Sequence, residues 1–204
     1  MPSVAQRFMR LLHAPIYSHR QDVLVNLITA HLPADARVLD VGCGFGHLGK
    51  AIMERSATVK VEGLERAKRE DELITVHAYD GSRMPWPDST FDAVILADVL
   101  HHELDPDHLL RESIRISRRY TVIKDHLRQG FFAQQRISLL DWAANAPYQV
   151  PCTYRYNNLP EWRRMFERAG VQLKEELTSI DIYPPGVNQL LGKGLHYFAV
   201  LQKN

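Results

Sequence analysis

Three glycines at alternate positions follow a short apolar run in the first quarter of the chain. The run is Arg37–Val41, with Asp40 near its end, and the glycines are Gly42, Gly44 and Gly46. Glycine lets the backbone pass close to a ligand and leaves N–H groups available to donate hydrogen bonds. The spacing therefore predicts a ligand-binding turn between a strand and a helix, with an ordinary tight turn as the alternative interpretation.

Ionisable side chains stand where later apolar runs end. Glu65 closes one such run, and Asp98 directly follows another. Asp125 and His126 follow a third. Ligands of open parallel sheets bind outside the carboxyl ends of the strands. We therefore expect these side chains to face one common site.

Strand-like and helix-like segments alternate along most of the chain. The predicted strands are Arg37–Val41, Lys60–Glu65, Leu73–Tyr79, Phe91–Ala97, Tyr120–Lys124, Val171–Ile180 and Leu195–Gln202. The predicted helices are an N-terminal one within residues 1–15, then Tyr17–His31, Gly46–Arg55, Pro106–Ser117, Phe131–Ala144 and Pro160–Ala169. Alternating β and α units predict an α/β fold with a doubly wound, mostly parallel seven-stranded sheet. We expect N-terminal helices over residues 1–31 and a helical or irregular insert after the fifth strand, at residues 127–158.

Composition limits the classes of protein that fit. With 204 residues the chain forms one domain, residues 1–204, and a formal net charge of +1 without a basic stripe argues against nucleic-acid binding. No apolar run approaches the ~18 residues that a transmembrane helix needs. The two cysteines, Cys43 and Cys152, give neither a disulfide framework nor a metal-ligand pattern, so we expect a cytoplasmic protein.

Residues 40–46, Asp-x-Gly-x-Gly-x-Gly, resemble the glycine-rich first motif of class I S-adenosylmethionine-dependent methyltransferases. Residues 84–102 add a Pro-aromatic-Pro turn, Phe-Asp, an apolar strand and an exit of the Asp-Val-Leu-His kind. This second stretch looks like methyltransferase type 11 and the quinone-biosynthesis methyltransferases, which act on small molecules. The resemblance extends from about residue 37 to residue 199. It implies S-adenosyl-L-methionine as cofactor and a small, partly apolar methyl acceptor as the partner molecule.

The resemblance assigns cofactor roles to residues at the strand ends. Glu65 would bind the ribose hydroxyls, with Glu62 as a competitor, and Asp80 would accept the adenine amino group. Asp80 and Gly81 also suit a simple turn. The full predicted set is Asp40, Gly42, Cys43, Gly44, Gly46, Glu65, Asp80, Gly81, Ala97 and Asp98.

The acceptor side rests on fewer signals. Aromatic and amide residues of the insert, among them Trp142, Asn145 and Tyr154, suit a small-molecule pocket, although Trp142 also suits core packing. The catalytic candidates are three ionisable residues at the ends of the fourth and fifth strands: His126, Asp125 and His101. Asp125 and His126 are candidates for a base and its orienter, or for a structural polar cluster. His102 is an alternative neighbour of the transferred methyl group. We predict no metal, because no short-range ligand motif supports one.

One departure and two alternatives qualify this interpretation. The connection from Glu65 to Asp80 is short and highly charged, so the helix usual at that place is shortened or missing. An NAD- or nucleotide-binding Rossmann enzyme is one alternative, although its glycines normally follow Gly-x-Gly-x-x-Gly. A non-catalytic partner subunit of the same fold is the other alternative.

Overall fold

A seven-stranded sheet runs through the computed structural model, which describes residues 18–145 and 152–203, without the side chains of residues 190 and 191. The strands are β1 (Arg37–Val41), β2 (Lys60–Glu65), β3 (Val76–Ala78), β4 (Phe91–Ala97), β5 (Ser117–His126), β6 (Gln172–Leu177) and β7 (His196–Gln202). Their order in the sheet is β3-β2-β1-β4-β5-β7-β6. β7 runs antiparallel to both of its neighbours, and the other pairs are parallel. The predicted fold class is confirmed.

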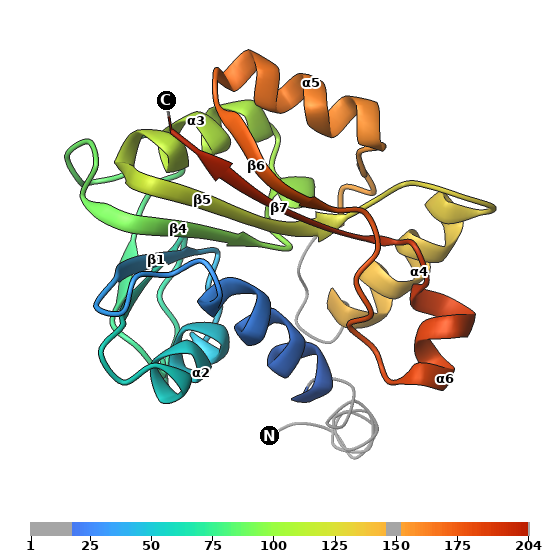
Figure 1. Cartoon of the computed structure of the whole chain (residues 1–204), viewed down its shortest axis with the longest axis horizontal. Coiled ribbons are helices and arrows are strands. Elements are labelled where there is room, and N and C mark those ends of the chain that lie inside the picture. Colours follow the sequence, from blue (N-terminus) through green and yellow to red (C-terminus); the bar gives the residue numbers. More distant parts are fainter. Residues whose placement is uncertain (1–17, 146–151, 204) are drawn as a thin grey trace.

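Helices cover both faces of the sheet (Figure 1). The longer ones are a helix over residues 18–29, α2 (His47–Arg55), α3 (Pro106–Ile116), α4 (Ala133–Asn145) and α5 (Leu159–Ala169). Short helical segments are η1 (Leu100–His102), α6 (Pro185–Val187) and η3 (Asn188–Gly192). In Figure 1, α3 and α5 lie over one face, and α2 with helix 18–29 lies over the other. α4 and α6 sit together beyond the end of β5, where they border the carboxyl edge of the sheet.

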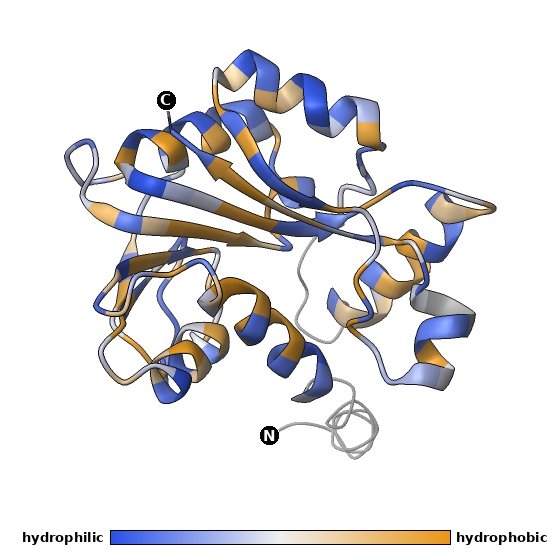
Figure 2. Ribbon diagram, in the orientation of Figure 1, coloured by the Kyte–Doolittle hydropathy of each residue, from blue (hydrophilic) through white to orange (hydrophobic). Residues whose placement is uncertain are grey.

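The central strands are apolar because both of their faces are covered. Ala93, Val94, Ile95 and Leu96 of β4 are all fully buried. Val94 and Leu96 pack into the core formed with α3 and α5, whereas Ala93 and Ile95 pack into the core formed with helix 18–29 and α2. Figure 2 shows the corresponding apolar band along the middle of the sheet. Continuous apolar strands of this kind are typical of parallel sheets between two helical layers.

Three strands differ by more than one residue from their predicted bounds. The third spans only Val76–Ala78 instead of Leu73–Tyr79, because it lies at the edge of the sheet and pairs with β2 alone. The fifth extends over Ser117–His126, because both β4 and β7 pair with it. Asp125 and His126, which were expected directly after the strand, are therefore its last two residues. The sixth strand ends at Leu177, where its pairing with β7 ends.

The connection between β2 and β3 contains no helix, as its charged sequence predicted. By contrast, the helical segment over residues 185–192, before β7, was not predicted. Its first residue, Pro185, lacks an N–H and has a fixed φ angle, both of which suit a first helical position. The N-terminal helix predicted within residues 1–15 lies outside the described residues.

Candidate active site

The candidate site lies at the carboxyl edge of the sheet, above the boundary between β1 and β4. The chain leaves β1 toward β2 on one side, and β4 continues the sheet on the other side. This change of direction creates the crevice in which doubly wound folds bind their ligands. Asp40 and the glycine turn end β1, and Asp98 follows β4 directly.

The three glycines of the turn have positive φ angles, but their surroundings differ. A Cβ atom on Gly42 would lie 2.6 Å from Val99, and one on Gly46 would lie 2.5 Å from Ile74. Among the described residues, a Cβ atom on Gly44 would have no atom within 4 Å apart from its chain neighbours. Packing therefore requires glycine at the first and third positions, whereas Gly44 faces open space that a ligand can approach.

Two carboxylates lie beside this turn. The Gly44 N–H donates a 2.6 Å hydrogen bond to Oε1 of Glu65, so the end of β2 reaches the loop. Asp40 is buried, and its Oδ2 has no hydrogen-bond partner within the described structure. Burial, and then the charge of Glu65, raises the pKa of Asp40 to about 7. A buried oxygen without a partner is costly, so this site is suited to a ligand that donates a hydrogen bond or carries positive charge.

Cys43 has a mainly structural environment. A Cβ atom on Gly63 of β2 would collide with its thiol, so the side chain of Cys43 lies directly against the β2 backbone. Burial raises the pKa of the Cys43 thiol, and the charges of Asp40 and Glu65 raise it further. The small thiol therefore fills space behind the loop and stays protonated at neutral pH.

The other cofactor candidates on this side are less buried. Glu62 already accepts hydrogen bonds from Arg37 and lies 2.8 Å from the His77 ring, which favours Glu65 over Glu62 as the ligand-binding carboxylate. Asp80 is exposed and accepts a 2.9 Å hydrogen bond from the Ser82 N–H. Gly81 beside it has a φ of 87°. The turn-forming interpretation of this pair is thus observed, and the adenine role of Asp80 and Gly81 stays a prediction.

Asp98 lies at the end of β4 between two cations. Its Oδ1 accepts a 2.5 Å hydrogen bond from Nζ of Lys124, and its Oδ2 pairs with the guanidinium of Arg20. Burial alone would raise the pKa of Asp98, but the charges of Lys124 and Arg20 hold it well below its usual value. Lys124 stands opposite Ala97 in the β4–β5 register. Arg20 was not predicted, because its place on a helix 78 residues earlier gives no local signal.

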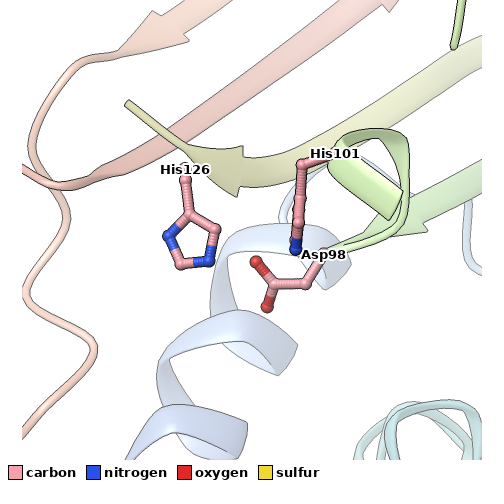
Figure 3. Close-up of side chains that lie close together, drawn as sticks. All are labelled: Asp98, His101 and His126. Carbon is pink, nitrogen blue, oxygen red and sulfur yellow. The ribbon is translucent and has the colours of Figure 1, made fainter. Parts of the chain in front are cut away.

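Two histidines converge beside Asp98. Figure 3 shows the side chains of Asp98, His101 and His126 pointing toward one another from η1 and the ends of β4 and β5. Nδ1 of His101 lies 2.6 Å from Oδ1 of Asp125. Burial lowers the pKa of His101, but the charge of Asp125 and its hydrogen bond outweigh burial and raise it to about 10. The His101 ring is therefore held in place by Asp125.

The His126 ring has a different environment. Asp125 contacts His126 through the backbone, since the His126 N–H donates a 2.7 Å hydrogen bond to Oδ1 of Asp125. Nδ1 of His126 is buried without a partner in the described structure. Burial, together with the charges of Lys124 and His101, lowers the pKa of His126 to about 4. The structure thus pairs the Asp125 side chain with the His101 ring rather than the His126 ring.

Asp141 completes this cluster, and it was not predicted from the sequence. It is buried on α4, where its Oδ2 accepts a 2.6 Å hydrogen bond from the Tyr156 hydroxyl and its Oδ1 lies 3.5 Å from Nε2 of His101. A single aspartate on a mixed helix resembles a solvent-facing residue in sequence. Its neighbours in the fold, His101, His102 and Tyr156, lie on other segments of the chain.

Of the predicted acceptor-binding residues, Asn145 contacts this cluster. The Asn145 side chain donates a 2.7 Å hydrogen bond to Oδ1 of Asp141, at the end of α4. Trp142 is 55% exposed and Tyr154 is 43% exposed, so core packing does not account for Trp142. Their roles in acceptor binding stay predictions. No helix within residues 18–145 and 152–203 has the length and apolar character needed to cross a membrane.

Comparisons with known proteins agree with this geometry. A family model described as a methyltransferase domain matches residues 16–176. The chain is 29% identical over 99 residues to 27-O-demethylrifamycin SV methyltransferase of Amycolatopsis mediterranei, a match that covers 43% of the chain and 36% of that protein. It also shares 24% identity over 164 residues with the uncharacterized methyltransferase YcgJ of Bacillus subtilis, covering 74% of the chain and 63% of that protein. The chain therefore spans between about a third and two thirds of the length of these curated relatives.

A solved structure shares the fold. 1,6-Didemethyltoxoflavin-N1-methyltransferase of Burkholderia thailandensis, with bound 1,6-didemethyltoxoflavin and S-adenosylhomocysteine, superposes with a TM-score of 0.65 at 17% identity. The match covers 91% of the chain and 78% of that structure. At this identity the likeness establishes the arrangement of the sheet and helices.

Proposed function

The chain belongs to the class I S-adenosylmethionine-dependent methyltransferases, and on that basis we propose that it transfers a methyl group from this cofactor to a small, partly apolar molecule. One observation carries the proposal. Gly44 faces open space at the carboxyl edge of β1, beside the unpartnered Asp40 carboxylate and the end of β2 at Glu65. This edge offers hydrogen-bond acceptors and a close backbone approach to a ligand that carries an amino group and a ribose.

The described residues fit such a cofactor. Asp40 would accept hydrogen bonds from the ammonium group, Glu65 would bind the ribose hydroxyls, and Arg20 would meet the carboxylate. The remaining proposed contacts come from the turn and from neighbouring strand ends: Gly42, Cys43, Gly44, Gly46, Asp80, Gly81, Ala97 and Asp98. The bound cofactor supplies a methyl group that its sulfonium already activates, so positioning the acceptor in line provides much of the acceleration.

We place the acceptor between the ends of β4 and β5 and the insert, residues 127–158. A cofactor above β1 directs its reactive end toward the neighbouring strand ends, where Asp98, His101 and His126 lie. Trp142, Asn145 and Tyr154 border this region from the insert. Their mixture of aromatic surface and a few polar groups suits a small molecule with an apolar part.

An acceptor that must lose a proton needs a base, and we propose His126 for that role. It is buried, it lies within the converging group of Figure 3, and its Nδ1 has no hydrogen-bond partner in the described structure. The His101 ring is instead held between the carboxylates of Asp125 and Asp141. In this proposal Asp125 is a positioning residue for the His101 ring.

Other expectations about the whole protein remain part of the proposal. Cys43 and Cys152 are thiols rather than halves of a disulfide, which supports a cytoplasmic location. The near-neutral net charge supports a small-molecule partner rather than a nucleic acid. The comparisons favour neither an NAD-binding enzyme nor a partner subunit without catalytic activity.

Transfer of a labelled methyl group tests the proposal. Cell metabolite extracts are incubated with methyl-labelled S-adenosylmethionine and the wild-type chain, and label in small molecules is measured. Gly44→Val places a branched side chain in the open space and should abolish transfer. Gly170→Val is the matched control, because Gly170 also has a positive φ and no atom within 4 Å of a Cβ placed on it, but lies at the end of α5. Equal transfer by wild type and Gly44→Val would contradict the proposed cofactor site.

A further inference from the structure

We propose that His101, His102 and Asp141 form a binding site for a divalent transition-metal ion, of which zinc is the best match. Within the described residues, these side chains bring one potential ligand atom each to a common place, with all three atoms within 4.8 Å of one another. Two imidazoles and a carboxylate form a ligand set that zinc accepts. No short motif announces this set, because Asp141 lies on α4, far along the chain from His101 and His102.

The distances suit an ion between these atoms better than direct hydrogen bonds. Nε2 of His101 lies 3.5 Å from Oδ1 of Asp141, and Nε2 of His102 lies 3.8 Å from the same oxygen. Ligand atoms about 2.0–2.1 Å from a tetrahedral zinc ion are separated by roughly 3.3 Å. Small side-chain movements would therefore complete the coordination.

The surroundings of His101 orient its Nε2 so that this atom can coordinate a metal ion. A carboxylate accepts hydrogen bonds, so Nδ1 of His101 donates to Asp125 in their 2.6 Å hydrogen bond. That hydrogen bond directs Nε2 toward Asp141, and Nε2 has no hydrogen-bond partner in the described structure although the side chain is only 3% exposed. Metal-bound histidines typically donate their other ring N–H to a carboxylate in this way.

Asp141 is supported in the same manner. The Tyr156 hydroxyl donates to its Oδ2 at 2.6 Å, and Asn145 donates to its Oδ1 at 2.7 Å, so the carboxylate has a fixed orientation. Among the described residues, its ion-pair partners are His101 and His102. Within the same part of the chain, Asp125 and Asp141 place two buried carboxylates around His101 without a lysine or arginine in an ion pair with either. A metal ion would compensate this negative charge, and so would a proton on His101.

A second combination, Asp98 with His101 and His126, is less suitable for a metal. Both oxygens of Asp98 are already engaged by Lys124 and Arg20. An ion placed there would face two cations and displace existing ion pairs. Because Nδ1 of His101 is committed to Asp125, its Nε2 can serve only one of the two sets, and the set with Asp141 is favoured.

The proposed metal site is accessible from solvent and has an open coordination position. The His102 side chain is 20% exposed, so the site is reachable from solvent. Three protein ligands leave a fourth tetrahedral position open, as in catalytic zinc sites. If the chain is a methyltransferase as proposed, this position would bind an acceptor oxygen and favour its deprotonation. Binding of the ion itself does not depend on that function.

Metal binding by the full-length chain tests the inference without an activity assay. Protein treated with a chelator is titrated with zinc in a calorimeter, and bound metal is counted by native mass spectrometry. We expect one zinc ion per chain, with cobalt giving the visible absorption of a tetrahedral site. Asp141→Asn and His102→Gln should each abolish stoichiometric binding, and Tyr156→Phe should weaken it by roughly 10–100-fold.

The control variant is Glu175→Gln, which removes a carboxylate from another His–carboxylate pair, with His31 at 3.3 Å, and should leave zinc binding unchanged. His102→Gln changes a partly exposed side chain and serves as the deciding variant if Asp141→Asn does not fold. Absence of zinc binding by the wild type would overturn the inference and leave a proton on His101 as the compensating charge. Unchanged binding by the His102 variant would overturn it as well.

Discussion

The two sides of the candidate site are built in opposite ways. The central part of the proposed cofactor side comes from one short stretch, Asp40 to Glu65. Within the described residues, the Asp40 Oδ2 has no hydrogen-bond partner there, and open space lies beside Gly44. The acceptor side brings together β4, β5 and the insert, and most of its charges pair with one another. Asp125 pairs with His101, and Asp98, at the boundary between the two sides, pairs with Lys124 and Arg20.

This difference indicates which interactions a ligand would meet on each side. At the Asp40 Oδ2 and beside Gly44, a ligand of the proposed cofactor side would gain contacts without breaking an ion pair. On the proposed acceptor side, atoms without a hydrogen-bond partner in the described structure, such as Nδ1 of His126, lie among ion pairs that hold the side chains in place, so a ligand must fit among these pairs. We therefore expect substitutions on the cofactor side to change affinity, and substitutions on the acceptor side to change turnover.

Replacing the proposed base should have the largest effect and sharpen this division. His126→Ala should reduce turnover of an acceptor found by the labelling experiment by about 10²–10⁴-fold. Cofactor affinity, measured by calorimetry, should be unchanged, because the ring lies on the acceptor side. His196→Ala removes another buried imidazole, 5.6 Å from the His126 ring, and controls for loss of packing. Turnover that persists in His126→Ala would assign this histidine a structural role.

Asp40 provides a test on the cofactor side through pH. Its folded-state pKa is raised to about 7, whereas in the unfolded chain the carboxyl returns to its ordinary pKa of 3.8. The folded state therefore binds more protons between these values, and the stability of the cofactor-free protein should fall as pH rises through this window. The penalty is on the order of 4 kcal/mol at full ionisation, since one pKa unit corresponds to about 1.4 kcal/mol.

Asp40→Asn should remove this pH dependence. Urea unfolding at about pH 5 and about pH 8 compares the variant with wild type, and the variant should gain relative stability at the higher pH. An equal difference between the two proteins at both pH values would show that Asp40 is not an unpaired buried carboxylate.

A third prediction separates the two carboxylates of β2. Glu65→Ala should weaken cofactor binding by roughly 1.5–3 kcal/mol, the range for hydrogen bonds to a charged group. Glu62→Ala is the natural comparison, because Glu62 pairs with Arg37 and His77 and its removal should leave affinity unchanged. Calorimetry with S-adenosylhomocysteine measures both, and the reverse result would transfer the ribose role to Glu62.

The sheet and the glycine turn after β1 were well predicted from the sequence, because both depend on local patterns, whereas the cofactor role of the turn stays a prediction. The apolar run Phe91–Ala97 and the glycine spacing each carry their information within a few neighbouring positions. Strand ends were less certain: β5 continues to His126 because β7, the last strand of the chain, pairs alongside it. Periodicity within Tyr120–Lys124 does not reveal that pairing.

The group of ionisable residues at the ends of β4 and β5 could be predicted only in part, because it depends on contacts between distant parts of the chain. His101, Asp125 and His126 were identified from their places at strand ends, but their pairing depends on side-chain directions. Asp141 and Arg20 were missed because each is an ordinary polar residue on a helix, and only tertiary packing brings them to the site. A charged residue on a helix can be recognised as a candidate site residue only when the structure shows that it is buried.

The central claim is that the edge beside β1 binds S-adenosylmethionine, and thermal unfolding with its product tests it most directly. A ligand at about ten times its dissociation constant adds roughly 1.4 kcal/mol to the stability of the native state. For a domain of this size, S-adenosylhomocysteine should raise the melting temperature by about 3–6 °C. NAD and NADP should leave the melting temperature unchanged. A shift with NAD or NADP and none with S-adenosylhomocysteine would contradict the account.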